Sequence, residues 1–133
     1  LDRTGGNHQP DIQPVASGDD VVEMGRLLRE VPIDREVQDY LVRVVRATHP
    51  DDTNAPDAVR KYVRYGSSPR GAQAMLSASR VTALLDGRFH VSCEDVRRIA
   101  LPALRHRVML SFEGEAEGQK TDDVIAGVLD KVS

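Results

Sequence analysis

The sequence predicts an all-α fold, a small helical bundle that leaves room for one short β ribbon. Apolar residues recur at the i, i+3, i+4, i+7 spacing of a helix face in about six segments. Short connections rich in turn-forming residues separate these segments, and no internal repeat is present. With 133 residues, of which 40% are hydrophobic and 29% charged, the chain is expected to fold as one soluble domain rather than stay disordered.

The first sixteen residues differ from the rest of the chain. They contain Gly5, Gly6, Pro10 and Pro14 and show no helical periodicity, which is typical of an extended connector. We therefore predict two parts: a connector over residues 1–16, leading in from something upstream, and a helical domain over residues 17–133.

Two amphipathic helices are predicted in the first part of this domain. Ser17 is placed to cap the first helix, which Pro32 ends, and Asp34 is placed to cap the second. The buried face of the first helix is expected to comprise Val21, Met24, Leu27, Leu28 and Val31. The second has the clearest apolar face in the chain, formed by Val37, Tyr40, Leu41, Val44, Val45 and Thr48.

The middle of the chain predicts a short helix and then a long one. Asp57 is placed to cap the short helix. Ser68 and Pro69 then suit the N-cap and the first helical position of a helix that runs to about Asp86. This long helix has apolar residues on nearly all sides, so we expect it to be the central, buried one.

The last third of the chain predicts two further helices and the β ribbon. Ser92, with Asp95 three residues later, starts one helix, which Pro102 should break or kink. Thr121 is expected to cap the last helix. The segments RFHV and VMLSF are predicted to pair as the ribbon.

Charge is distributed unevenly along the chain. The formal net charge is −3, but residues 58–112 hold 10 basic against 3 acidic residues, and both flanking segments are acidic. Three explanations remain open: the basic side chains pair with acidic groups of neighbouring elements, bind nucleic-acid phosphates, or contact a charged partner such as ATP. Because the acidic flanks oppose nucleic-acid binding, we expect no nucleic-acid partner.

The cysteine, the histidines and the apolar runs of the sequence argue against disulfides, metal sites and membrane spans in this chain. The single cysteine, Cys93, forms no disulfide within the chain, and a reducing, cytoplasmic setting is expected. The four histidines lack the spacing of a metal site, so we predict no metal ligands. No apolar run approaches the roughly 20 residues of a membrane span. The acidic run EGEAEG is predicted to be an extended, solvated segment.

The segment YGSSPRGAQAM contains the most informative motif. Gly66 and Gly71 have the spacing of a phosphate-binding loop, but Ala72 and Gln73 occupy the positions where such a loop needs Lys and Ser or Thr. Pro69 also removes one of the backbone N–H groups that such a loop points at phosphate. The segment is therefore not that loop.

Arg70 is the residue of this segment whose side chain could bind a phosphate. It lies in the first turn of the predicted central helix, where the helix dipole attracts anions, and its guanidinium offers a fork of donors to a phosphate. From the residues alone, two interpretations remain: a phosphate-binding arginine, or an incidental surface arginine after an ordinary helix cap.

Two stretches of the chain carry a family resemblance: this segment and RVTALLDGRFHVSCEDVRRIALPALRHRVMLSFEGEAEGQKTDDVIAGVL. They resemble the C-terminal lid domain of MoxR-type AAA+ ATPases. The first residues, LDRTGG, resemble the segment that leaves the ATPase core of these proteins. The resemblance covers nearly the whole chain. It implies a helical bundle of the AAA+ lid type that closes over ATP and Mg²⁺ bound in a preceding core, within a ring expected to be a hexamer. It also implies chaperone-like remodelling or metal insertion by the parent protein, with von Willebrand factor A domain proteins among the partners.

In that family the lid supplies a sensor 2 arginine that reaches the γ-phosphate, and this role falls on Arg70. Gly66, Ser68 and Pro69 would then shape the nucleotide-binding loop that positions it. The phosphate loop, the acidic magnesium-binding segment and the arginine finger belong to the family's core and are absent from these residues. The resemblance thus implies that this chain alone is no enzyme, whereas its parent hydrolyses ATP. The alternative is a helical nucleic-acid-binding or protein-docking module that uses the basic segment 58–112.

Overall fold

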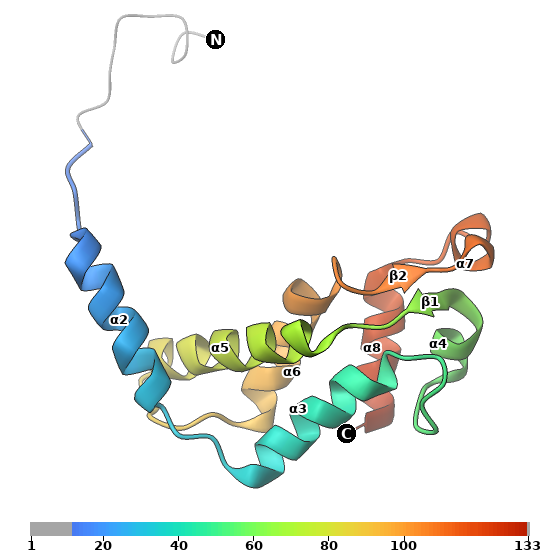
Figure 1. Ribbon diagram of the computed structural model, residues 1–133, viewed down its shortest axis with the longest axis horizontal. Helices are drawn as coiled ribbons and strands as arrows, with labels where there is room; N and C mark the ends of the chain where they lie inside the picture. Colours follow the sequence, from blue (N-terminus) through green and yellow to red (C-terminus); the bar gives the residue numbers. More distant parts are fainter. Residues whose placement is uncertain (1–11, 133) are drawn as a thin grey trace, which may run out of the picture.

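The structure, a computed structural model, describes residues 12–132 (Figure 1). The elements in chain order are α2 (Gly18–Glu30), α3 (Arg35–Ala47), α4 (Asp57–Tyr62), β1 (Val63–Tyr65), α5 (Pro69–Leu85), α6 (Cys93–Leu104), β2 (Met109–Leu110), α7 (Phe112–Ala116) and α8 (Thr121–Val132). Seven helices and one two-stranded ribbon within residues 12–132 confirm the predicted class. Among these helices, none is long and apolar enough to cross a membrane.

Four helices form the body of the fold. α5 packs along α6 and against α3, and α8 packs against both α3 and α6. Figure 1 shows α3 and α5 in front of α6 and α8. The core between them is mostly aliphatic, as expected for a sequence with only 4% aromatic residues. Its fully buried side chains include Val44, Met75, Val96, Leu104 and Ile125.

Several helix starts and one complete helix face were predicted correctly. Ser17 and Ser92 each form a capping box with the aspartate three residues later, at the starts of α2 and α6. In α3, the predicted apolar face is the buried face. Its buried members, including the residue that ends the helix, are Val37, Tyr40, Leu41, Val44, Val45 and Thr48.

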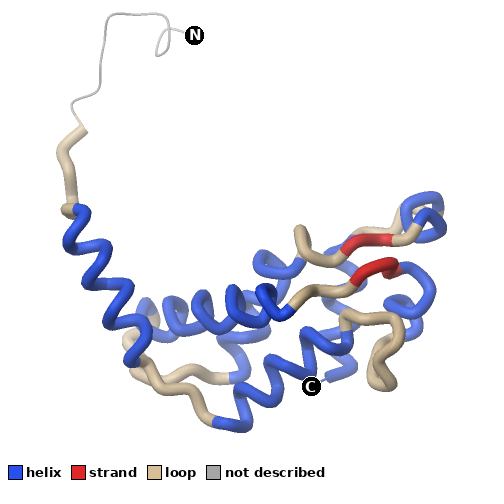
Figure 2. Tube along the Cα trace, viewed as in Figure 1, coloured by secondary structure: helices blue, strands red, loops and turns tan. Residues whose placement is uncertain are grey.

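The predicted burial of α2 is wrong except at its end. Val21, Met24 and Leu27 are 61%, 59% and 48% exposed, whereas Val31, just after the helix, is fully buried. α2 extends away from the bundle, and its end nearest the bundle contacts α5 (Figure 2). Helical periodicity identifies an apolar face, but it does not show which element covers that face.

α5 is central but is not buried on all sides, which corrects a second prediction. Its buried stripe consists of Gly71, Met75, Ser79, Thr82 and Ala83. At its C-terminal end Leu84 and Leu85 are 36% and 82% exposed. α6, α3 and α2 all contact α5, and the side they leave exposed is the stripe of Gln73, Ser77, Val81 and Leu84.

The β ribbon forms, but not between the two segments that were predicted to pair. β2 pairs antiparallel with β1, with the partners Val63↔Leu110 and Tyr65↔Met109. In the segment RFHV, Val91 makes only an isolated parallel bridge with Ile33. Alternating hydrophobicity marks a segment as strand-like, but the packing of the helices determines which segment it meets.

Two C-terminal predictions also need correction. The acidic run at residues 113–118 is not extended, because most of it belongs to α7, whose first turn is capped by the Ser111 hydroxyl accepting from the Gly114 N–H at 3.1 Å. α6 does not break at Pro102 but continues to Leu104. Pro102 has no N–H to donate to the Arg98 carbonyl oxygen, and only two helical residues follow it, so α6 ends shortly after the proline rather than at it.

Candidate functional site

Arg70 lies at a helix start that the sequence predicted correctly. Ser68 is the N-cap residue of α5, with φ −69° and ψ 169°, and Pro69 is the first helical residue. The Ser68 side chain makes no capping hydrogen bond, but its carbonyl oxygen accepts from the Gly71 N–H at 2.8 Å. The first turn is therefore closed through the backbone, and Ser68 itself stays exposed.

The Arg70 guanidinium is exposed and has no partner among residues 12–132. Within residues 12–132 it makes no hydrogen bond, ion pair or aromatic contact. Arg64, in β1, differs because it lies over the Tyr65 ring, with its guanidinium carbon 5.2 Å from the ring centroid. An arginine that is anchored by a helix and free at its head is available to an anionic ligand.

The loop before α5 packs tightly against the C-terminal end of α3. A Cβ atom on Gly66 would lie 2.7 Å from the carbonyl oxygen of Thr48. The backbone N–H of Ser67, a fully buried residue, donates to Thr48 Oγ1 at 2.9 Å. His49 Nε2 lies 2.9 Å from the Ser67 carbonyl oxygen. These contacts fix the start of α5 relative to the end of α3.

The four predicted site residues lie together at this helix start, but sequence reasoning missed the residues behind them. The sequence predicts no metal site for the four histidines, and it assigns no role at this site to His49 or Ser67. The glycine before Ser67 was the available signal, because a glycine beside a helix cap often marks a close backbone approach. Nothing in the sequence pointed to a partner eighteen positions earlier.

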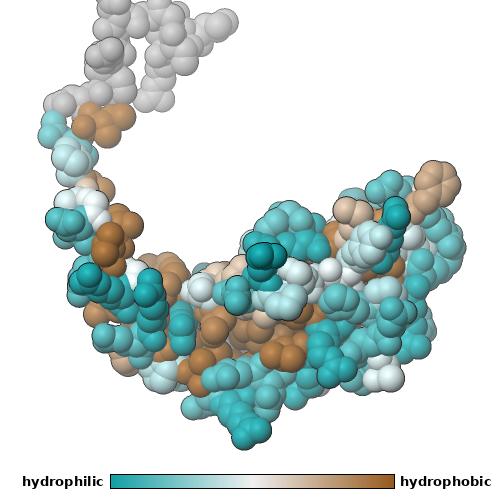
Figure 3. All heavy atoms as spheres, in the orientation of Figure 1, coloured by the Kyte–Doolittle hydropathy of each residue, from teal (hydrophilic) through white to brown (hydrophobic). Residues whose placement is uncertain are grey.

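An apolar groove lies between α3 and α5 beside this site. It is lined by Ile33, Leu41, Val42, Ala72 and Leu76, and it continues past Val45 to His49, Ser67 and Pro69. Figure 3 shows hydrophobic atoms gathered between the two helices. Pro69, the residue before Arg70, therefore forms part of the wall of an apolar surface.

Most other basic residues of segment 58–112 are engaged within the chain. The ion pairs are Arg88 with Asp86 and Asp95, Arg97 with Asp130, Arg98 with Asp86, Arg105 with Asp122, and Lys61 with Glu113 and Glu117. Pairing with acidic neighbours thus explains much of the uneven charge. Arg70 differs from these residues because no acidic side chain in the described part of the chain pairs with its guanidinium.

The Cys93 thiol and the acidic residues give little support for a catalytic thiol or a metal site. Cys93 is partly buried, and burial raises the pKa of its thiol, which opposes activation by the dipole of α6. In the part of the chain that the structure describes, no group of three or more His, Cys, Asp and Glu side chains is arranged to hold a metal ion.

Comparison with known proteins relates this fold to a family. Residues 56–128 match the AAA lid domain. Chaperone MoxR1 of Mycobacterium tuberculosis (strain ATCC 25618 / H37Rv) is 30% identical over 124 residues, which are 93% of this chain and 33% of that protein. Protein MoxR of Paracoccus denitrificans is 46% identical over 55 residues, which are 41% of this chain and 16% of that protein.

A solved structure agrees with these relatives. The crystal structure of a protein assigned as an ATPase, from Cytophaga hutchinsonii ATCC 33406, superposes with a TM-score of 0.89 at 30% sequence identity, covering 98% of this chain and 40% of that chain. This chain spans about a third of the length of MoxR1. The match over residues 56–128 and the shared fold show that this chain belongs to the AAA lid domain family and is homologous to the MoxR family of chaperones.

Proposed function

We propose that this chain is the nucleotide-responsive lid of a MoxR-type AAA+ ATPase and that Arg70 is its sensor 2 arginine. The observation that carries the proposal is the exposed guanidinium at the start of α5, which has no partner among the described residues, in a chain of the AAA lid family. In this role the lid closes over ATP bound in the core of the parent protein, and Arg70 reaches the γ-phosphate.

The helix start has the chemistry that a phosphate contact needs. Arg70 offers a planar fork of N–H donors, and the positive end of the α5 dipole lies at the same place. Pro69 contributes no backbone N–H, so the side chain of Arg70 carries the contact. Gly66, Ser68 and Pro69 shape the loop that presents it.

Arg70 is proposed to act by electrostatic stabilisation. Negative charge on the transferred phosphoryl group is redistributed during the reaction, and a fixed cationic donor lowers the energy of that state. Because the donor belongs to the lid rather than to the core, hydrolysis depends on lid closure. This dependence makes the lid responsive to the nucleotide.

The remaining groups for hydrolysis are assigned to the parent's core. They are the phosphate loop, the magnesium ligands and the arginine finger, so ATP and Mg²⁺ are proposed cofactors of the parent and are not firmly held by this chain. The proposed partners are the upstream core, neighbouring subunits of a hexameric ring and von Willebrand factor A domain proteins. A role in chaperone-like remodelling or metal insertion in the cytoplasm completes the proposal, and the naming of MoxR1 as a chaperone supports it.

The proposal is tested by replacing Arg70 in the full-length parent ATPase. Arg70→Ala should lower ATP hydrolysis by roughly 10- to 1,000-fold, the loss expected for one transition-state donor. Arg70→Lys should restore only part of the rate, because an ammonium group keeps the charge but loses the planar fork. The melting temperature should change little, since the side chain is exposed.

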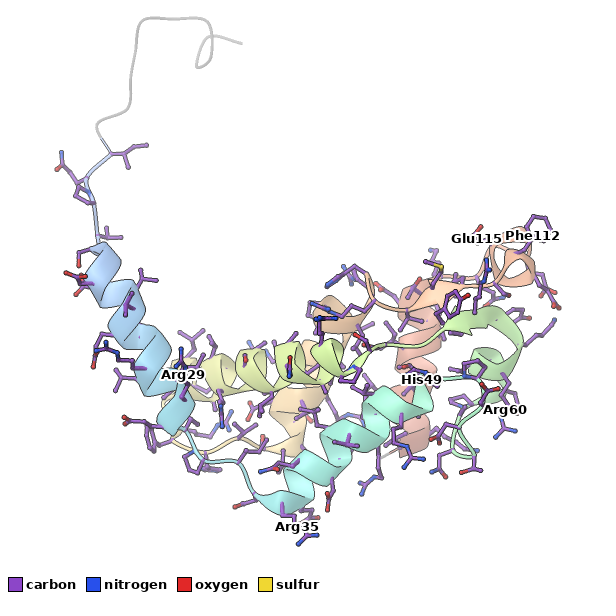
Figure 4. All side chains as sticks on the ribbon, viewed as in Figure 1. Arg29, Arg35, His49, Arg60, Phe112 and Glu115 are labelled. Atoms are coloured by element: carbon purple, nitrogen blue, oxygen red, sulfur yellow. The ribbon has the colours of Figure 1, made fainter. Side chains whose placement is uncertain are left out.

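Arg35→Ala is the matched control. Arg35 is an exposed arginine at the first position of α3 (Figure 4), so its replacement removes the same charge from a comparable helix start. The control should hydrolyse ATP at the wild-type rate. Wild-type hydrolysis by an Arg70→Ala protein that is folded and assembled would refute the sensor 2 assignment.

A further inference from the structure

A buried hydrogen-bonded contact joins the end of α3 to the loop that carries Arg70. Thr48, at the C-terminal end of α3, is 1% exposed, and its hydroxyl donates to the Val45 carbonyl oxygen at 2.6 Å. The same oxygen accepts the N–H of Ser67 at 2.9 Å. Because the donating proton is already committed to α3, the Thr48 hydroxyl presents an oriented acceptor to Ser67.

The next residue of each segment reinforces this contact. His49 Nε2 lies 2.9 Å from the Ser67 carbonyl oxygen, so both backbone polar groups of Ser67 have partners at the end of α3. A Cβ atom on Gly66 would lie 2.7 Å from both the Thr48 carbonyl oxygen and His49 Cγ. Only glycine allows this approach without displacing the backbone of one segment.

Ser67 also contacts α5 directly. Its side chain lies against Gly71, where an added Cβ atom would overlap Ser67 Oγ. Gly71 is the third residue of α5 and follows Arg70 immediately. Ser67 therefore sits between the end of α3 and the first turn of α5, and its position determines where that turn begins.

We propose that Thr48, His49, Gly66 and Ser67, here called the α3–α5 latch, are positioning residues for Arg70. The inference rests on the proposed function of Arg70 and extends it to residues on another helix. The latch transmits the position of α3 to the Arg70 side chain, so that the guanidinium meets the γ-phosphate in a defined place when the lid closes.

Apolar packing between the two helices does not provide this control. Leu41 of α3 and Leu76 of α5 line the groove on either side, and such contacts are non-directional, so they tolerate small rotations. Hydrogen bonds to Ser67 depend strongly on angle and distance. The helices can therefore stay packed after the latch is lost, while Arg70 is no longer held in place.

The test is a double-mutant cycle in the full-length parent ATPase. Thr48→Val removes the hydroxyl but keeps the side-chain shape, and it should lower kcat for ATP by about 3- to 30-fold, as expected for a misplaced group. Thr48→Ser should retain most of the wild-type rate, because it keeps the hydroxyl. In an Arg70→Ala background, Thr48→Val should lower kcat by less than about 2-fold, because residues that act through one another are not additive.

His49 supplies a second variant that keeps the test valid if Thr48→Val fails to fold. His49 is exposed, so His49→Ala should fold, and it should show the same dependence on Arg70 with a smaller effect. Thr82→Val is the matched control for stability: it removes another buried threonine hydroxyl of the lid, bonded to the Ala78 carbonyl oxygen at 3.1 Å, far along α5 from Arg70. It should leave kcat unchanged.

The outcomes separate the latch from the proposed function. If Arg70→Ala slows hydrolysis but the latch variants do not, the latch proposal is wrong and the sensor 2 assignment stands. If Thr48→Val lowers kcat by the same factor in the wild-type and Arg70→Ala backgrounds, Thr48 has a general structural role and the latch proposal is wrong. If Arg70→Ala itself has no effect, both proposals fail.

Discussion

Arg88 donates a hydrogen bond from each of its two terminal nitrogens to the carboxylate of Asp95. Nη2 lies 2.6 Å from Oδ1, and Nη1 lies 2.8 Å from Oδ2. The same carboxylate accepts the N–H and the hydroxyl of Ser92, each at 2.8 Å, to complete the capping box of α6. Asp95 is 2% exposed. One buried carboxylate thus ties the loop after α5 to the start of α6.

This arrangement predicts a loss of stability at acid pH. The Arg88 guanidinium, helped by the Ser92 hydrogen bonds, holds the pKa of Asp95 at about 2, below the ordinary 3.8. Because the pKa is lower in the folded than in the unfolded chain, the contribution is fully present above pH 3.8 and is lost as the pH falls toward 2. It amounts to roughly 2 kcal/mol of unfolding free energy, at about 1.4 kcal/mol per pKa unit.

Urea unfolding of the 133-residue chain at a series of pH values between neutral and strongly acid measures this contribution. Asp95→Asn should be less stable than wild type at neutral pH and should lose less stability on acidification. Asp123→Asn, at an exposed aspartate in the first turn of α8, should follow the wild-type curve. Parallel curves for the Asp95→Asn and Asp123→Asn chains would contradict the assignment.

Two methionines that share a helical pattern are predicted to differ in their contribution to stability. Met75 is fully buried in α5, whereas Met24 in α2 is 59% exposed. Met75→Ala should cost about 2 to 5 kcal/mol of unfolding free energy through lost burial and a cavity. Met24→Ala should change it by less than about 0.5 kcal/mol. Chemical denaturation of the two variants measures both losses of unfolding free energy. Equal losses would mean that the apolar face of α2 is covered.

Two helical glycines should respond in opposite directions to alanine. A Cβ atom on Gly127 in α8 meets nothing within 4 Å, so Gly127→Ala should stabilise the chain by about 0.5 to 1 kcal/mol through helix propensity. A Cβ atom on Gly71 would overlap Ser67 Oγ and approach Leu104 Cδ2 to 3.2 Å. Gly71→Ala should therefore destabilise by about 1 kcal/mol or more. Thermal unfolding curves of both variants check the signs.

Local chemistry explains which features the sequence predicted. The caps at Ser17 and Ser92 depend on side chains three residues apart, and the start of α5 at Pro69 depends on a fixed backbone angle. Such features need no distant partner. For the same reason the segment alone placed Arg70 in the first turn of a helix, whereas its role as a phosphate contact stays a prediction.

The features that the sequence did not predict depend on long-range packing. The partner of β2 proved to be β1 rather than the segment RFHV, and α2 showed an apolar face without the expected cover. The contact between Thr48 and Ser67 joins positions nineteen apart that carry no paired signal in the sequence. Each of these depends on how the helices pack, which periodicity within one segment does not encode.

The 133-residue chain is predicted not to bind duplex DNA tightly at physiological salt. Arg97, Arg98 and Arg105 of the basic segment are engaged by acidic side chains, and those acids would have to be displaced by phosphates. α5 presents apolar residues such as Leu85 rather than a row of basic ones. An electrophoretic mobility shift at two salt concentrations tests this, and a tight, salt-sensitive shift would instead favour a nucleic-acid-binding module.

The chain by itself is predicted to show no measurable ATP turnover. Arg70 and the dipole of α5 offer one side chain and one partial charge to a phosphate, whereas hydrolysis also needs a cradle of backbone N–H groups, a lysine and magnesium ligands. In the segment YGSSPRGAQAM these positions carry Pro69, Ala72 and Gln73, which supply none of the required groups. Any affinity for nucleotide should accordingly be weak.

Phosphate release from the purified chain with ATP and magnesium provides the measurement, with the Arg70→Ala chain as its matched control. Both proteins should give the same background rate, because residual release comes from contaminants that do not depend on Arg70. Robust magnesium-dependent release that co-elutes with the wild-type chain and falls in the Arg70→Ala chain would show that the chain carries a complete active site. In that case the division of labour between a sensing lid and a separate hydrolysing core would be wrong, even though Arg70 would still contact the nucleotide.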